Sequence, residues 1–447
     1  MRHSCLCRPS VHGGQGGNVW TVDEFAFSRY TARAMEIDTS KLIRKSMGFR
    51  NEVLPVLTKD YASPLIERIK ENNFKLETGE LTICLAHEFG FCYGVDRAVI
   101  LAYETRKKFP NKRIFLTSEI IHNPQVNSKL KENGIYFLSD PEWQGKGFDV
   151  VTEDDVVIIP AFGTTTGDLI KLQAKGCELV DTTCGSVLNV WKRVDSYAQG
   201  GFTAIIHGKY EHEETRATSS RARMIPGGKF LVVLNMEQAE MVCDFISVKI
   251  SEEEFSQAFK KEAMSEGFDP KRDLVKVGCA NQTTMLSSES LAIANKIESA
   301  VKERYGETEL HKHFCHFDTI CSATQDRQDA IIKLVKSGID LAIVIGGYNS
   351  SNTGHLVEIA SEFCPSFHIN DASEILSRGE IRHQPAFKKE TMVTKNWLTN
   401  FNRTPSGGEG LACDIRIGVT AGASTPNRVM EDVIRRLLEI TTLGDKR

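Results

Sequence analysis

Three segments of the chain share one arrangement: an apolar strand, a short loop that ends in cysteine, and then an amphipathic helix. The strands are LTICLA, CELV and HFCHF, the loops are HEFGFC, DTTC and DTIC, and the loops end at Cys92, Cys184 and Cys321. Two further strand–loop–helix steps follow each of them, first with a polar loop and then with a loop of small hydroxyl residues. A repeat of this kind constrains the fold, because each repeated unit must bury its apolar face against a neighbour.

The alternation of strands and helices predicts an α/β protein with small, mostly parallel sheets covered by helices. In such sheets the functional loops lie at the carboxyl ends of the strands. Three like units related by a pseudo-threefold arrangement can therefore bring the three cysteine loops to one centre, where we expect an iron–sulfur cluster. The predicted organisation is an N-terminal extension at 1–35, expected to be poorly ordered, a helical segment at 36–80, and α/β units at 81–177, 178–312 and 313–447.

The bulk composition excludes several other classes. The 447 residues have a net charge of −4 and 26% charged residues, so they lack the basic excess typical of nucleic-acid and membrane-surface proteins. No apolar stretch approaches the length of about 18 residues that a membrane helix needs. The twelve cysteines include no C-x-x-C pair, and the N-terminus has no apolar secretory core. Reduced thiols and metal ligation are therefore favoured over disulfides.

Each of the three loop cysteines is expected at a helix N-terminus, where partial positive charge stabilises a thiolate. Gly90 and Gly94 flank the first of them, and glycine permits the close backbone approach that a bulky cluster needs. Three thiolates can hold one [4Fe–4S] cluster with one iron left open, whereas four cysteines are usual for electron transfer. We interpret five other cysteines as small buried hydrophobes: Cys84, Cys243, Cys279, Cys364 and Cys413. Cys177 and Cys315 are closer rivals for the ligand role, but they fall before or inside the strands, where thiols point into packing.

An ordered set of motifs spans the chain from about residue 40 to its C-terminus. These are GFCYGVDRAV, SEIIHNPQVN, VDTTC, HGKYEHEET, NQTTML, TICSATQDRQDA, GGYNSSNTGHL and GVTAGASTP. Together they closely resemble the LytB or IspH family of 4-hydroxy-3-methylbut-2-enyl diphosphate reductases, and in particular its cyanobacterial and plant-plastid branch. The resemblance implies reductive dehydroxylation of an allylic diphosphate to isopentenyl and dimethylallyl diphosphate, the last step of the non-mevalonate isoprenoid pathway.

The resemblance also implies roles for individual residues. Cys92, Cys184 and Cys321 match the cluster ligands. Glu214 matches a proton-relaying acid, and Thr283 and His212 match groups that assist it. The residues that match the substrate- and diphosphate-binding groups are His122, His212, Thr283, Ser350, Ser351, Asn352 and Ser424. The electrons are expected from a ferredoxin or flavodoxin, and the compartment is the cytoplasm in a bacterium or the plastid stroma in a photosynthetic eukaryote.

Two positions depart from the family pattern. Phe162 stands where many bacterial members have a phosphate-contacting histidine, so another loop must compensate for the missing donor. Gly185 replaces the proline usual after the second cysteine and loosens that loop. Two polar stretches, about 238–272 and 377–412, are predicted to be surface insertions.

Three other functions remain open from the residues alone. A cluster dehydratase would share the three cysteines and the open iron but would need no electron donor. A non-catalytic iron–sulfur redox sensor would need the cysteines but not Glu214. A metal-free α/β binding protein would need neither the three cysteines nor Glu214.

Overall fold

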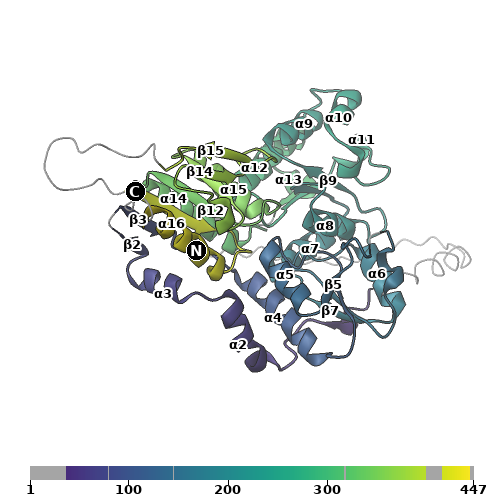
Figure 1. The fold of residues 1–447 in the computed structure, drawn as a ribbon. Coiled ribbons are helices and arrows are strands. Elements are labelled where there is room, and N and C mark those ends of the chain that lie inside the picture. The colour runs from purple at the N-terminus through teal and green to yellow at the C-terminus, as the bar shows by residue number, and fades with distance from the viewer. Residues whose placement is uncertain (1–36, 79, 144, 317–318, 399–414, 443–447) are drawn as a thin grey trace, which may run out of the picture. The chain divides into compact units, whose positions relative to one another are not determined.

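The computed structural model describes residues 37–78, 80–143, 145–316, 319–398 and 415–442 (Figure 1). The predicted extension at 1–35 lies outside these residues. Residues Thr39–Arg447 form one compact unit. Its first elements are η1 (Thr39–Lys41), β1 (Leu42–Ile43), α2 (Arg50–Tyr61), α3 (Pro64–Glu71) and β2 (Lys75–Glu77).

Three sheets carry the fold, and each contains four parallel strands in the same spatial order. In the first sheet the order is β7 (Glu178–Asp181), β6 (Val156–Ile159), β4 (Ile114–Leu116) and β5 (Ile135–Phe137). In the second it is β11 (Phe314–His316), β10 (Val277–Asn281), β8 (Thr203–His207) and β9 (Phe230–Val233). In the third it is β3 (Leu81–Leu85), β16 (Ile415–Ala421), β12 (Leu341–Ile345) and β13 (Ser366–Ile369). The predicted α/β class and its threefold repeat are confirmed.

Two strands extend these sheets at their edges, and a hairpin stands apart from them. Strand β1 adds to β7 in parallel, and β2 adds to β3 in the antiparallel direction. The hairpin consists of β14 (Glu380–His383) and β15 (Met392–Lys395). The predicted surface stretch at 377–412 contains this hairpin, and its residues 399–412 lie outside the described part of the chain.

The sheets are offset by one strand from the sequence ranges proposed as units. The strand that leads into each cysteine loop pairs with strands of the preceding range: β7 pairs with β6, and β11 with β10. The first such strand, β3, pairs with β16 from the far end of the chain, and Figure 1 shows the purple strand beside the C-terminal ones. Alternation along the chain predicts parallel pairing, but side-chain packing decides which sheet a strand joins. Each proposed unit therefore contributes one strand to the sheet of another unit, and the pairing of β3 with β16 joins the first unit to the last.

Helices cover the sheets on their apolar faces, which explains why the central strands are buried along their whole length. The helices that follow the cysteine loops are α4 (Tyr93–Lys108), α7 (Gly185–Gln199) and α14 (Ser322–Lys336). The others are α5 (Pro124–Glu132), η2 (Gly147–Val150), α6 (Thr166–Lys175), α8 (Glu213–Ala222), α9 (Met236–Ile246), α10 (Glu252–Ala258), η3 (Lys261–Ala263), α11 (Pro270–Asp273), α12 (Ser287–Tyr305), α13 (Leu310–His313), α15 (Ser351–Ser361), η4 (Ala372–Glu374) and α16 (Asn427–Thr442).

The prediction of a surface insertion at about 238–272 is wrong for its first part. Helix α9 packs in the core of the second sheet through Val242, Phe245 and Ile246, and Phe255 of α10 is buried in the same cluster. The polar residues of this stretch occupy the outer faces of the helices, so the average polarity of the segment hid two amphipathic helices.

Candidate active site

Cys92, Cys184 and Cys321 each occupy the N-cap position of their helix, before α4, α7 and α14 respectively. None of the three side chains caps its helix through a hydrogen bond. All three are free, half-buried thiols. The positive end of each helix therefore faces a thiol that is available to a ligand.

The fold brings the three cysteine loops together. A methyl group at Gly94 would lie 2.4 Å from the Sγ of Cys184 and 3.9 Å from the Sγ of Cys92. The hydroxyl of Ser186 donates to the Sγ of Cys321 at 3.4 Å. Burial raises the pKa of the Cys184 thiol, and the charges of Cys92 and Cys321 raise it further. Thiolates this close repel one another unless a positively charged group lies among them.

A closed ring of side-chain contacts holds the loops in place. Arg97 of α4 donates to the carbonyls of Thr182 and Thr183, both at 3.2 Å, in the loop before Cys184. Ser186 of α7 contacts Cys321, as described above. Arg327 of α14 donates to the carbonyl of Gly90 at 2.7 Å, in the loop before Cys92. Each cysteine-bearing helix thus fixes the loop of the next cysteine.

The residues at this centre fit an iron–sulfur cluster better than a single metal ion. Within the described ranges, no three His, Cys, Asp or Glu side chains converge as the ligands of one ion. In a cubane each thiolate binds a different iron, so its ligands must surround a volume and not a point. Three thiols on three helix N-termini, with the side-chain-free Gly94 between two of them, meet that requirement.

Glu214, the second residue of α8, is fully buried and is linked through Thr283 to the helix that begins after Cys321. Its carboxylate accepts hydrogen bonds from the backbone N–H of Thr283 at 2.6 Å and from the Thr283 hydroxyl at 2.9 Å. The carbonyl of Thr283 in turn accepts from the hydroxyl of Thr324, three residues beyond Cys321. Burial raises the pKa of Glu214 to about 7, although both bonds from Thr283 lower it. A carboxyl group with such a pKa can hold and release a proton at neutral pH.

Two histidines connect Glu214 to the surface of a cavity. The Nδ1 of His212 accepts from the backbone N–H of Glu214 at 3.1 Å, and burial lowers the pKa of His212 to about 3. The neutral ring therefore carries its proton on Nε2, which lies 3.3 Å from the Nε2 of His122. The Nδ1 of His122 then donates to the carboxylate of Glu119 at 3.0 Å. This order of donors and acceptors fixes the tautomers of both rings.

A cavity of about 870 Å³ opens at the carboxyl ends of strands from all three sheets. Its wall includes four of the predicted site residues, His122, His212, Ser350 and Ser351. Loops that follow β4, β8 and β12 supply them, as the position of functional loops in parallel sheets predicts. The volume is sufficient for a small diphosphate. The other predicted site residues do not line this cavity: Cys92, Cys184, Cys321, Glu214, Thr283, Asn352 and Ser424.

The other predicted polar groups lie around this wall. Ser424 donates to the backbone carbonyl of His122 at 3.2 Å. Asn352 is buried, and neither the Nδ2 nor the Oδ1 of its side chain has a hydrogen-bond partner within the described structure. Because an unpaired buried amide is costly, this side chain indicates that a polar ligand completes the site.

Phe162 contacts both histidines of the site. Its ring stacks on that of His122 with centroids 4.2 Å apart and an angle of 21°, and it meets His212 edge-on at 5.7 Å. In place of a donor, this position therefore supplies an apolar surface that orients His122. At Gly185 an added methyl group would meet no atom within 4 Å, so this position has room for a side chain.

Sequence reasoning missed two residues that hold the site. Glu119 receives hydrogen bonds from His122 and from the Nδ2 of Asn349 at 2.9 Å. Gln282 accepts from the backbone N–H of Lys209 at 3.1 Å and lies 3.4 Å from the hydroxyl of Ser351. Both stand inside recognised motifs, SEIIH and NQTTML, but only the fold shows what they contact.

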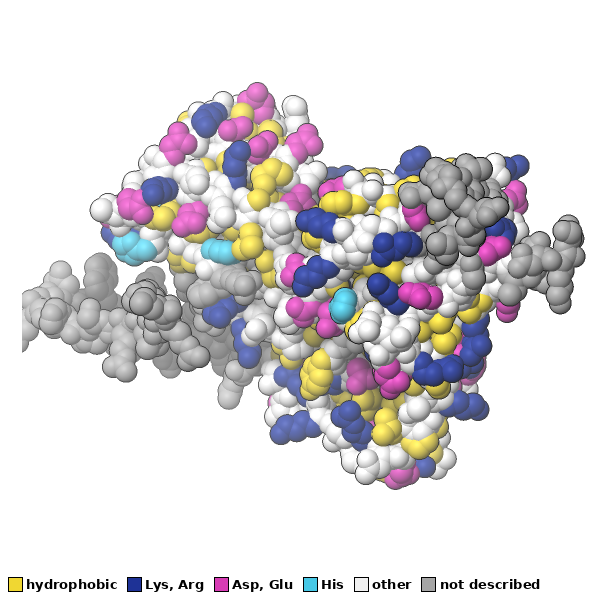
Figure 2. Space-filling model, turned by 90° about the vertical axis from the view of Figure 1, so that its left-hand side faces the viewer, with side chains coloured by type: hydrophobic (Ala, Val, Ile, Leu, Met, Phe, Trp, Pro, Cys, Tyr) yellow, Lys and Arg dark blue, Asp and Glu magenta, His cyan; other side chains and the backbone are white. Residues whose placement is uncertain are grey.

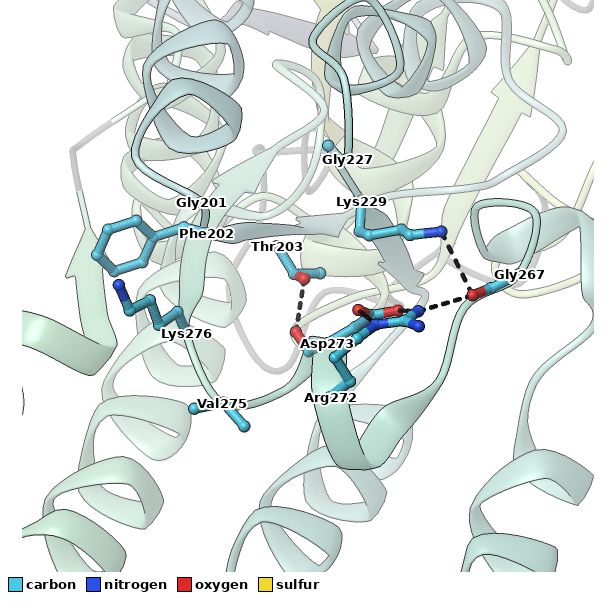
Figure 3. Close-up of a pocket in the computed structure, with 11 residues that line it drawn as sticks. Gly201, Phe202, Thr203, Gly227, Lys229, Gly267, Arg272, Asp273, Val275 and Lys276 are labelled. Carbon is cyan, nitrogen blue, oxygen red and sulfur yellow. Dashed lines mark hydrogen bonds and ion pairs between the residues drawn. The ribbon is translucent and has the colours of Figure 1, made fainter. Parts of the chain in front are cut away.

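A separate cavity of about 600 Å³ lies at the amino ends of β8, β9 and β10, opposite to the functional loops. Figure 3 shows Lys229 and Arg272 pointing toward Gly267, whose carbonyl accepts from them at 3.3 and 2.9 Å. The hydroxyl of Thr203 likewise donates to the backbone carbonyl of Asp273. Since these cations already hold the surrounding loops, we assign this cavity a structural role.

Figure 2 shows one face on which basic and acidic side chains are interspersed and hydrophobic ones are scattered. Within the described residues, no helix is both long and apolar enough to cross a membrane.

Comparison with known proteins identifies the family. Residues 83–438 match the family model of the LytB protein. The chain is 48% identical over 413 residues to the 4-hydroxy-3-methylbut-2-enyl diphosphate reductase of Gloeobacter violaceus, covering 92% of this chain and 95% of that protein. It is 47% identical over 402 residues to the enzyme of the same name from Crocosphaera subtropica, covering 90% of this chain and 95% of that one.

A solved structure supports the fold. The E-1-hydroxy-2-methyl-but-2-enyl-4-diphosphate reductase of Plasmodium falciparum superposes with a TM-score of 0.56 at 21% identity, covering 80% of this chain and 88% of that one. With a family model that spans most of the sequence and relatives nearly half identical over nine-tenths of it, the chain belongs to the LytB family of iron–sulfur enzymes.

Proposed function

We propose that this chain reduces (E)-4-hydroxy-3-methylbut-2-enyl diphosphate to isopentenyl and dimethylallyl diphosphate, the last step of the non-mevalonate isoprenoid pathway. The observation that carries the assignment is the buried Glu214–Thr283 pair beside three converging cysteine loops. The allylic C–O bond breaks and a C–H bond forms, while two electrons and two protons are consumed and water leaves.

Cys92, Cys184 and Cys321 would hold one [4Fe–4S] cluster, with one iron free of protein ligands. When bound, such a cluster supplies the electrons and an electron-poor iron that polarises the substrate hydroxyl. The electrons come from a small redox protein, a ferredoxin or a flavodoxin. The compartment follows the host, the cytoplasm of a bacterium or the stroma of a plastid.

The side chains of the site deliver the proton, orient the acid and bind the diphosphate. Glu214 delivers a proton to the leaving oxygen, for which its raised pKa and complete burial are suited. Thr283 and His212 orient that carboxyl group through the hydrogen bonds described above. The diphosphate is bound by the polar groups His122, Ser350, Ser351, Asn352 and Ser424.

The test is anaerobic purification followed by iron and sulfide analysis and by turnover with a chemical reductant. We expect about four iron and four sulfide per chain, and both products only when the reductant is present. Product formation without reductant would favour a dehydratase. Full activity in an iron-free protein would refute the cluster assignment, and a loaded protein without activity would favour a redox sensor.

Electron paramagnetic resonance of the reduced protein tests the substrate site directly. We expect the signal to change when the diphosphate substrate is added. A spectrum that substrate leaves unchanged would count against substrate binding at the cluster.

A further inference from the structure

The loop between β14 and β15 forms part of the wall of the 870 Å³ cavity. Residues Gln384, Pro385, Ala386, Phe387, Lys388 and Lys389 all line it, together with the histidines and serines of the site. The hairpin therefore shares a cavity wall with four of the residues predicted to bind the substrate.

This loop is anchored at its base and strained at its tip. The backbone N–H of Gln384 donates to the carbonyl of His368 in β13 at 2.9 Å, and its side chain donates to the carbonyl of Lys389 at 2.8 Å. Phe387 at the tip has a φ of +61° and is 79% exposed. A bulky aromatic residue rarely adopts this left-handed conformation, and strain of this kind concentrates at ligand clamps and switches.

Three ammonium groups belong to the same cavity wall. Lys388 and Lys389 come from the hairpin, and Lys209 comes from the loop after β8. All three are exposed, and within the described part of the chain none forms an ion pair with a carboxylate.

The acids of the cavity, in contrast, have partners of their own. Glu119 accepts from His122 and Asn349, and Glu358 pairs with His355 at 2.7 Å. Glu211 accepts from the hydroxyl of Tyr210 at 2.8 Å. Burial raises the pKa of the remaining acid, Glu213. These four acids each accept a hydrogen bond or lie partly buried, whereas the three ammonium groups are exposed and have no carboxylate partner among the described residues, so an anion that enters the cavity can bind to them.

We propose that the loop Gln384–Lys389 is an anion-binding lid, in which Lys388 and Lys389, with Lys209, bind the diphosphate group of the substrate. This rests on the proposed function for the identity of the ligand. The lysines attract the anion to the cavity, and the tip at Phe387 closes over it and excludes water. The lid acts on substrate binding and leaves the proton transfer at Glu214 unchanged.

Binding of inorganic pyrophosphate to the full-length protein tests the lid by calorimetry, without turnover. The double variant Lys388→Gln/Lys389→Gln is expected to bind about tenfold more weakly at low ionic strength, since each exposed charge pair contributes modestly. The difference is expected to shrink as salt is added. The variant Lys388→Arg/Lys389→Arg keeps both charges and is expected to retain most of the affinity.

A matched control removes two positive charges elsewhere on the third sheet and the hairpin. Lys75 of β2 and Lys395 of β15 are exposed and do not line the cavity. The variant Lys75→Gln/Lys395→Gln has the same net charge as the lid variant and is expected to bind pyrophosphate like the wild type. Equal weakening in both variants, or no weakening in the lid variant, would overturn the proposal.

Limited digestion with trypsin tests closure of the loop. We expect cleavage after Lys388 and Lys389 to slow when pyrophosphate saturates the protein, while other exposed sites are cut as before. Unchanged cleavage would refute closure.

Turnover measured on the same preparations separates the two proposals. The lid variant is expected to raise KM about tenfold with kcat unchanged. If no preparation, including the wild type, turns over the allylic diphosphate, the proposed function fails, and the pyrophosphate measurements still decide on the lid.

Discussion

Thr283 donates both its backbone N–H and its hydroxyl to the carboxylate of Glu214, at 2.6 and 2.9 Å. The two bonds favour the charged form of the acid, while complete burial favours the neutral form. Burial has the larger effect and raises the pKa to about 7. The same contacts fix the direction of the carboxyl group, so one residue controls both the proton affinity and the geometry of the acid.

Replacing the acid tests its role in proton delivery. We expect Glu214→Gln to lower kcat by about 10²- to 10⁴-fold, the range typical of a lost general acid, while the iron and sulfide content stays at the wild-type level. The exposed Glu240→Gln on α9 serves as the control and should leave both quantities unchanged. Normal turnover by Glu214→Gln would remove this residue from the mechanism.

Replacing Thr283 tests how its hydrogen bond and burial together set the pKa of Glu214. Thr283→Val removes the hydroxyl donor that stabilises the ionised carboxylate, so the pKa of Glu214 should rise further above 7. Since the protonated acid is the active form, the alkaline fall in kcat should move to higher pH by about one unit. The measurement is the pH profile of kcat in wild type and variant. A shift to lower pH would contradict the assigned direction.

The aromatic contact on His122 yields a third prediction. Phe162→Ala removes the ring that stacks on His122 at 4.2 Å. A lost aromatic contact of about 0.5–1.5 kcal/mol predicts a roughly 2- to 13-fold increase in KM with little change in kcat. The half-exposed Phe363→Ala at the end of α15 is the control. A fall in kcat at unchanged KM would show that the ring acts on chemistry and not on binding.

Much of this site could be predicted from the sequence because its residues repeat at equivalent points of equivalent steps. The three cysteines follow three strands of like composition, and parallel strands bring their carboxyl ends together. His122, Ser350 and Ser351 follow other such strands and line one cavity at this edge. The repeat predicts the position of their polar loops, whereas the family resemblance singles out these residues.

The pairing of the strands could not be read in the same way. Strands β5, β9 and β13 have only three or four residues each and were not anticipated as a fourth member of each sheet. Assigning β3 to a sheet with β16 requires a contact across almost the entire chain. Local alternation of residues carries no information on such pairing, which depends on packing.

The contacts between helices and loops also could not be predicted from the sequence. The ring formed through Arg97, Ser186 and Arg327 depends on which helix faces which loop. The lid at Lys388 and Lys389 lies in a segment whose polarity suggested a plain surface insertion. Its role follows from the wall that it shares with His122, which no spacing in the sequence reveals.

Gly94 and Gly185, which lie close to Cys92 and Cys184, differ in the space around them, so replacing each tests whether the cluster site requires a residue without a side chain. A methyl group at Gly94 would lie 2.4 Å from the Sγ of Cys184, whereas at Gly185 it would meet no atom within 4 Å. Both positions lie in the first turn of a helix, where alanine favours the helical backbone. Gly94→Ala should therefore fold but displace Cys184, and we expect it to lose most of its iron and its activity.

Gly185→Ala is the matched control and should bind iron like the wild type. Iron and sulfide per chain, measured on anaerobically purified protein, compare the two variants, and circular dichroism verifies that both are folded. Equal iron in the two would mean that Cys184 can move without loss of the cluster, and the tight approach at Gly94 would then have no part in ligand geometry.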